Sequence, residues 1–150
     1  MTHRGKETAT GQWVYGSLVE INSDGSFPHT SIVSHQLVKG EPQWSAVDKK
    51  TVTAWTGLWD GSTPPKQVFD GDILRSDEYP YNSDGKDNYY GVVFWDDETA
   101  RFGIETVRSA TATVRGASDG NCSSLENITD FQVIGNVFEN INLLRERYKF

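Results

Sequence analysis

The strongest strand signal in the chain is the run from Tyr89 to Trp95, which reads Tyr-Tyr-Gly-Val-Val-Phe-Trp. Aromatic and β-branched residues are enriched in strands because their side chains pack well on a pleated surface. The polar residues 96–99 then supply a turn, after which Phe102, Ile104 and Val107 continue the apolar pattern. The sequence therefore predicts a β-hairpin at this point, and a chain built from such runs folds into sheets.

Turn residues separate further runs of the same kind. Residues 13–21 are aromatic and β-branched and end at turn residues 22–25, which predicts a strand. Two strands joined by a tight turn at Asp70-Gly71-Asp72 are predicted over residues 67–74. Weaker patterns predict short strands near residues 32–38 and 44–55, and a last strand at 131–134 precedes a short helix near the C-terminus. Periodicity thus gives an all-β, mainly β chain of many short strands.

Two stretches suggest how the chain is divided. Residues 1–11 are polar and lack apolar periodicity, which predicts a disordered leader ahead of a β domain spanning residues 12–150. Pro64 and Pro65 lie in a loop that cannot be helical or lie in a central strand. The loop suggests a boundary near residues 60–66, with a small barrel or sheet on either side.

Composition restricts the partners and the compartment. The formal net charge of -7 repels phosphate backbones over most of the surface, so general binding of nucleic acid is disfavoured. Cys122 is the single cysteine, which fits a reducing cytosol. No apolar stretch is long enough to span a bilayer. We therefore expect a cytoplasmic protein without membrane contact.

The residues that could carry catalysis have simpler structural roles. Asp70 with Asp72, and the acidic run 96–98, could bind a divalent cation in a metal-dependent enzyme. Each group lies at a predicted turn, where solvated aspartates are common. The histidines His3, His29 and His35 are scattered, and the chain has no phosphate-binding glycine loop. We predict no catalytic residue, metal ligand or cofactor, and keep the metal-dependent enzyme as an alternative.

Three motifs occur in one order along the chain: Thr56-Gly57-Leu58, the block 69–73 (Phe-Asp-Gly-Asp-Ile), and the block 131–140, which contains Ile-Gly-Asn-Val-Phe-Glu-Asn. In this order the chain resembles the YopX-like proteins of bacteriophages and prophages, from about Trp13 to Leu144. The resemblance implies a small accessory protein of a phage, with SH3-like barrel character and no established activity. It also implies an N-terminal edge strand, which residues 1–11 lack or replace.

The motif residues themselves indicate turns. Gly71 suits a tight strand connection, in which Asp70 and Asp72 can bind backbone amides. Gly135 and Asn136 are residue types that tolerate left-handed dihedral angles, so we expect that conformation there. These motifs are interpreted as folding signals.

Aromatic side chains offer the best candidates for a binding site. Trp55 and Trp95 lie inside strand patterns and are expected to be buried. Trp59, Tyr79 and Tyr81 lie beside or within polar loops, so we predict that these three contact a partner protein, or further copies of the chain, in the host cell. The alternative is a nucleic-acid-binding barrel that uses the basic residues near the C-terminus, Arg145, Arg147 and Lys149.

Overall fold

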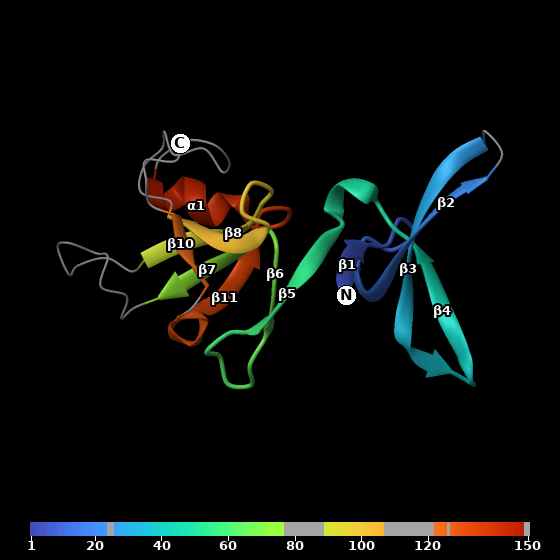
Figure 1. The fold of residues 1–150 in the computed structure, drawn as a ribbon, viewed down its shortest axis with the longest axis horizontal. Coiled ribbons are helices and arrows are strands. Elements are labelled where there is room, and N and C mark those ends of the chain that lie inside the picture. Colours follow the sequence, from blue (N-terminus) through green and yellow to red (C-terminus); the bar gives the residue numbers. More distant parts are fainter. Residues whose placement is uncertain (24–25, 77–88, 107–121, 126, 149–150) are drawn as a thin grey trace. The chain divides into compact units, whose positions relative to one another are not determined.

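The computed structural model describes residues 1–23, 26–76, 89–106, 122–125 and 127–148 (Figure 1). The chain divides into two compact units, Met1–Trp55 (unit 1) and Thr56–Phe150 (unit 2). This boundary precedes the loop at 60–66 that the sequence suggested. Strands dominate, in two antiparallel sheets with one short helix, so the expected all-β class is confirmed. No closed barrel is detected in the described residues, although an isolated antiparallel bridge between Glu7 and Val47 joins the segments after β1 and β4, so the SH3-like barrel is not confirmed.

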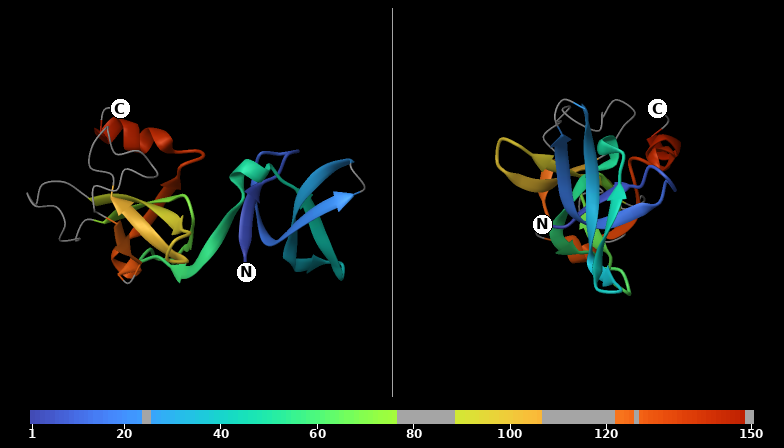
Figure 2. Two further views of the ribbon diagram at one scale, coloured as in Figure 1. Left: turned by 45° about the horizontal axis from the view of Figure 1, so that its top comes forward. Right: turned by 90° about the vertical axis from the view of Figure 1, so that its right-hand side faces the viewer.

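Unit 1 is one antiparallel sheet. Its strands lie in the order β4-β3-β2-β1-β5, and β5 is followed in that order by β6 of unit 2. The long strand β3 forms one hairpin with β2 and another with β4 (Figures 1 and 2). The bounds are β1 (His3–Lys6), β2 (Trp13–Ser23), β3 (Ser26–Val38), β4 (Glu41–Ala46), the 3-10 turn η1 (Lys49–Thr51) and β5 (Thr53–Trp59).

Strand β1 shows that the expected disorder of residues 1–11 is wrong for residues 3–6. The strand is not at an edge, because it pairs with β2 on one side and β5 on the other. Arg4 is buried, its Nε donates a hydrogen bond to Thr53 Oγ1 (3.1 Å), and its guanidinium lies 4.7 Å from the centre of the Trp13 ring. A buried cation held by a hydrogen bond and an aromatic ring leaves no hydrophobic pattern in the sequence, so the strand escaped prediction.

Unit 2 contains the predicted hairpin. β8 pairs with β9 with Trp95 opposite Phe102, and the turn lies where residues 96–99 predicted it. Cys122 lies in strand β10, opposite Glu105. The sheet order is β10-β9-β8-β7-β11. The bounds are β6 (Gln67–Phe69), β7 (Asp72–Ser76), β8 (Tyr89–Asp96), β9 (Arg101–Thr106), β10 (Cys122–Ser124), the 3-10 turn η2 (Ile128–Asp130), β11 (Gln132–Asn136) and α1 (Ile141–Tyr148).

The two units differ in how much apolar surface they bury. Both hydrophobic clusters of the described residues belong to unit 2: one is built around Val68, Leu74 and Phe131, and the other around Ile73, Val92 and Leu144. In unit 1, only Ile32 and Val47 appear among the fully buried hydrophobic side chains of the described residues. Unit 2 therefore has its own core, whereas unit 1 is a sheet with a small internal contact.

Among the described residues, no helix has the length and apolarity needed to cross a bilayer.

Candidate functional site

One face of the unit 1 sheet carries a group of apolar side chains. Residues opposite each other in antiparallel strands share a face, and alternate residues of one strand return to it. Ser17, Val33 and Trp44 are opposite one another across β2, β3 and β4. Leu37 is opposite Pro42, which lies two residues before Trp44 and so on the same face. Tyr15 and Ile21 lie on this face of β2. We call Tyr15, Ile21, Val33, Leu37 and Trp44 the apolar face.

Most of the apolar face is open to solvent. The exposed fractions are 62% for Leu37, 57% for Trp44, 47% for Tyr15 and 43% for Ile21. The opposite face is buried around Ile32, which is 1% exposed, and a Cβ added to Gly5 would lie 3.1–3.2 Å from side-chain atoms of Val47 and Ile32; at the end of β3, Val38 on that face is 54% exposed. The sheet therefore uses one face for its internal contact and leaves the other uncovered.

Gly16 is needed where β2 and β3 come closest. A Cβ at this position would lie 1.9 Å from the carbonyl oxygen of Val33, which no side chain can accommodate. The close approach places Val33, on the apolar face, directly beside the backbone of β2. The geometry of the apolar face thus depends on a glycine that contributes no surface of its own.

Strand β4 forms the edge of the sheet beside the apolar face. Within Glu41–Ala46 only Ser45 is partly buried and the other side chains are exposed. Glu41 and Pro42 stand at the outer end, where a charge and a proline discourage pairing with a further strand. Trp44 lies on this edge strand. Because Glu41 and Pro42 discourage strand addition at the edge, a partner is more readily bound by the apolar face of the sheet than by its edge.

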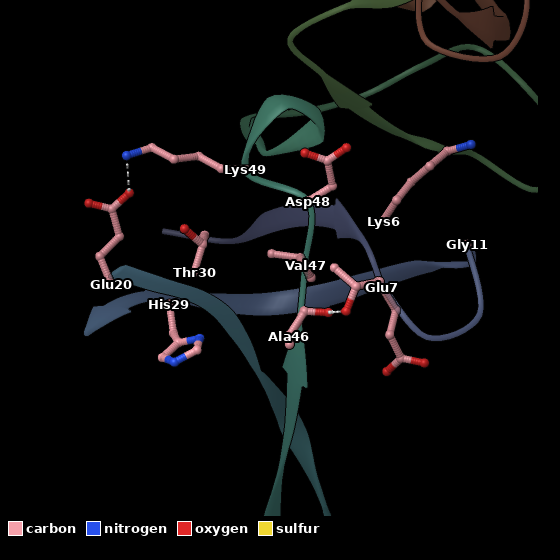
Figure 3. A pocket seen from close by; sticks show the side chains of 11 residues that line it. Lys6, Glu7, Gly11, Glu20, His29, Thr30, Ala46, Val47, Asp48 and Lys49 are labelled. Carbon is pink, nitrogen blue, oxygen red and sulfur yellow. Dashed lines mark hydrogen bonds and ion pairs between the residues drawn. The ribbon is translucent and has the colours of Figure 1, made fainter. Parts of the chain in front are cut away.

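A polar pocket of about 900 Å³ lies elsewhere in unit 1 (Figure 3). Its charged lining comes from Lys6, Glu7, Glu20, Asp48 and Lys49. Lys49 Nζ pairs with Glu20 at 3.1 Å, and both side chains are well exposed. Glu7 accepts a hydrogen bond from Thr10 Oγ1 (3.0 Å), and Asp48 accepts one from the backbone nitrogen of Lys50 (3.0 Å). The three carboxylates of the pocket thus support nearby turns and pairs.

Metal binding finds no support in the described part of the chain, where no group of three or more His, Cys, Asp or Glu side chains is placed to hold an ion. The acidic turn at 96–98 has a structural explanation. Asp96 accepts hydrogen bonds from the hydroxyl of Thr99 and from the backbone nitrogen of Glu98, and the Thr99 contact is the main reason that the pKa of Asp96 lies below its ordinary value. The carboxylate caps its own turn.

The predicted partner-binding residues are only partly placed. Trp59 is 49% exposed at the end of β5, while Tyr79 and Tyr81 lie outside the described residues. Arg145 and Arg147 belong to α1, but the structure does not describe their side chains, and Lys149 lies outside the described residues. The expectation that Trp95 is buried is wrong, since it is 38% exposed and stacks edge-to-face on Phe102 at 4.9 Å. Trp55 is half-buried.

Asp60 follows β5, outside the three motifs, and its carboxylate accepts several hydrogen bonds. It is buried and accepts from the backbone nitrogens of Lys66 (2.8 Å), Val133 (2.8 Å) and Ser62 (3.0 Å) and from Ser62 Oγ (2.7 Å). Burial by itself would raise the pKa of Asp60, but these hydrogen bonds outweigh it and hold the pKa below its ordinary value. The carboxylate fastens the loop at 60–66 to β11.

The Asp70-Gly71-Asp72 turn joins two strands as the sequence predicted, but the expectation of a solvated aspartate is wrong for Asp72. Gly71 has φ +84°, its nitrogen donates to the carbonyl of Val93 (2.8 Å), and its carbonyl accepts from Val137 (2.9 Å). Asp72 is fully buried, and its Oδ2 accepts from the backbone nitrogen of Phe69 (2.7 Å). This turn therefore joins β6 and β7 and also fastens the segment after β11.

The block 131–140 forms a reciprocal cap ahead of α1. Asn136 Oδ1 accepts from the nitrogens of Phe138 and Glu139 (3.0 Å each), and Asn140 Oδ1 accepts from the nitrogen of Asn136 (3.2 Å). The expected left-handed conformation at Gly135 and Asn136 is wrong, since neither has a positive φ. Gly135 is required because a Cβ there would lie 2.6 Å from Asn140 Oδ1. The side chains of Asn136 and Asn140 therefore stabilise the backbone between β11 and α1.

Comparison with protein-family models matches residues 2–145 to the model described as YopX protein. The match includes β1, which the sequence resemblance from Trp13 onward did not reach. No curated protein matches the chain.

Proposed function

The chain belongs to the YopX family, and from that premise we propose that it is a phage or prophage accessory protein that acts as a non-enzymatic, protein-binding β module. The binding surface is the apolar face of unit 1. Unit 2 provides the well-packed part of the chain.

The exposure of the apolar face is the observation that carries this proposal. Soluble monomers rarely leave contiguous apolar patches uncovered unless the patch binds something. Burying a large apolar side chain yields about 1.5–3 kcal/mol. Because Tyr15, Ile21, Leu37 and Trp44 are each about half exposed, covering all four would contribute about 3–6 kcal/mol to binding. This is a substantial share of the roughly 8 kcal/mol that corresponds to micromolar affinity.

The roles of four polar residues of unit 2 support the non-enzymatic part of the proposal. The side chains of Asp60, Asp72, Asn136 and Asn140 accept hydrogen bonds from backbone amides of their own unit. A catalytic carboxylate or amide must instead present its atoms to a substrate. The family motifs of this chain therefore support the shape of unit 2.

Affinity capture from bacterial host lysate tests the proposal. The tagged chain is compared with a face variant, Trp44→Ser combined with Leu37→Ser, whose fold is checked by circular dichroism. We expect the face variant to lose at least about nine-tenths of the captured partner, since exposed apolar anchors dominate binding energy. Capture equal to that of the unmodified chain would refute the assignment of the surface.

The matched control is the triple variant Trp59→Ala, Tyr79→Ala, Tyr81→Ala. It replaces three aromatic residues but leaves the apolar face intact, and we expect it to capture normally. Loss of capture only in the triple variant would move the site to those loops. Half of each eluate is treated with nuclease, and capture that depends on nucleic acid would favour the alternative that uses Arg145, Arg147 and Lys149.

A further inference from the structure

We propose that the apolar face binds a second copy of this chain, so that the two unit 1 sheets pack face to face about a two-fold axis. This proposal rests on the proposed function, because it names the partner of the same surface.

The first argument is the number of layers. A stable sheet covers its apolar face with another layer, either a helix or a second sheet at about 10 Å. In unit 1, Ile32 is 1% exposed on one face of the sheet, whereas Leu37, Trp44 and Ile21 on the apolar face are 43–62% exposed. A second sheet with the same pattern supplies the missing layer. Two-fold packing of one patch on itself is also the commonest form of homo-oligomer contact.

The second argument is the distribution of charge. Residues 1–55 contain five Lys or Arg and five Asp or Glu residues, so unit 1 has no net charge. Residues 56–150 contain nine Lys or Arg and sixteen Asp or Glu residues, so the entire net charge of -7 is in unit 2. Two copies of this chain repel each other through unit 2 but can meet through unit 1 without a net electrostatic penalty.

The apolar face itself also lacks net charge. Its five side chains are uncharged. Those that share its rows across β2, β3 and β4 are Ser17, Val19, Ser31 and Ala46, together with His29 opposite Ile21 and His35, whose Nε2 lies 2.8 Å from Ser17 Oγ. A partner selected by opposite charge would need a charged patch at this position. An uncharged face of mixed aromatic and aliphatic character is instead complementary to itself.

The third argument is area. An aromatic side chain buries about 150–250 Å² when fully covered, so the half-exposed Tyr15 and Trp44 each offer roughly 100 Å², and Ile21 and Leu37 add smaller aliphatic areas. Together with the neighbouring Val19, Val33, Pro42 and Ala46, one copy offers on the order of 500 Å². Two copies then approach the roughly 1,000 Å² that a specific interface requires.

Sedimentation velocity of the full chain over a range of concentrations tests the proposal. We expect a species of twice the 16.8 kDa chain mass at about 100 µM. The variants Trp44→Glu and Leu37→Glu each place two like charges in the interface and should weaken association by at least about 100-fold. Trp59→Glu makes the same change at an exposed tryptophan of unit 2 and should sediment as the unmodified chain does.

The proposal is overturned if the unmodified chain stays monomeric at every concentration. It is also overturned if the dimer persists in both Trp44→Glu and Leu37→Glu. Leu37→Glu provides a second reading if Trp44→Glu fails to fold, which circular dichroism detects. The proposed function fails separately: if the chain is monomeric but the face variants still lose a captured protein, protein binding stands and only the second copy is wrong. If neither association nor capture changes, both are wrong.

Discussion

Replacing Asp60 with alanine should destabilise unit 2 strongly, although the residue takes part in no proposed contact with a partner. Its carboxylate accepts four hydrogen bonds, three of them from backbone nitrogens. In the variant the backbone nitrogens of Lys66 and Val133 lose their acceptor. Hydrogen bonds to a charged group contribute about 1.5–3 kcal/mol, and the Lys66 and Val133 amides are only partly buried and can regain water, so Asp60→Ala should lower the free energy of unfolding by about 1.5–3 kcal/mol.

Urea unfolding followed by tryptophan fluorescence measures this change. Asp97→Ala is the matched control, because Asp97 is an exposed turn residue and surface changes usually alter the free energy of unfolding by less than about 0.5 kcal/mol. If Asp60→Ala is no less stable than this control, the hydrogen bonds to Asp60 do not hold the loop at 60–66 on β11, and the reasoning is refuted.

The pH dependence of Asp60 gives a second reading of the same contact. Because the pKa of Asp60 is lowered in the folded state, its contribution is fully present above the ordinary aspartate value of about 3.9. It is lost as the pH falls through the lower, folded-state pKa. The stability difference between the unmodified chain and Asp60→Asn should therefore be constant from pH 7 to pH 5 and shrink below about pH 4. A difference that is constant down to acid unfolding would contradict the assignment.

Three further changes test the interpretation of the motifs. Asn140→Ala should lower the free energy of unfolding, measured in urea, by about 1–2 kcal/mol, because it removes the acceptor for the Asn136 nitrogen. The control Asn142→Ala, at an exposed position of α1, should have little effect. Equal effects of the two changes would contradict the capping role of Asn140. Gly71→Ala should lower the free energy of unfolding by about 1 kcal/mol more than Gly57→Ala. Both glycines have positive φ, but only a Cβ at position 71 would meet Phe138 (3.3 Å). Equal losses of stability in urea would contradict the packing argument. Magnesium, manganese or calcium should leave the Tm unchanged, and a rise with any of them, measured by scanning calorimetry, would revive the metal-dependent enzyme.

Local sequence patterns predicted much of unit 2. The run at 89–95, the polar turn after it and the apolar residues beyond it correspond to β8 and β9, and the tight turn at Gly71 has the positive φ that its residue types suggested. The short terminal helix is also confirmed as α1. These elements were predictable because residue preference and tertiary packing agree there.

Long-range contacts explain what the sequence did not reveal. Strand β1 is fixed by pairing with β2 and β5 and by the contacts of Arg4, none of which has a local pattern. Gly135 is required by the approach of Asn140 rather than by its own dihedral angles. From the sequence alone, a glycine required by a positive φ cannot be told from a glycine required by a close contact.

The candidate site illustrates the same limit. Trp44 and Leu37 lie in segments whose patterns suggested ordinary strands, and alternation along a strand shows two faces without showing which one is covered. Only the pairing of β2, β3 and β4 puts Tyr15, Leu37 and Trp44 on one face, and only the burial of Ile32 shows that this face is the open one. The sequence singled out Trp59 for its place beside a loop, and its exposure agrees with that choice.

The most direct test of the account is hydroxyl-radical footprinting of Trp44, read by mass spectrometry. The dilute chain is compared with the assembled chain or with the complex recovered from host lysate. The account predicts that Trp44 and Tyr15 react readily in the dilute chain and are protected at least about fivefold on binding, while Trp95, 38% exposed in unit 2, reacts equally in both. Equal reactivity of Trp44 in the free and bound states would show that the apolar face is not the binding surface.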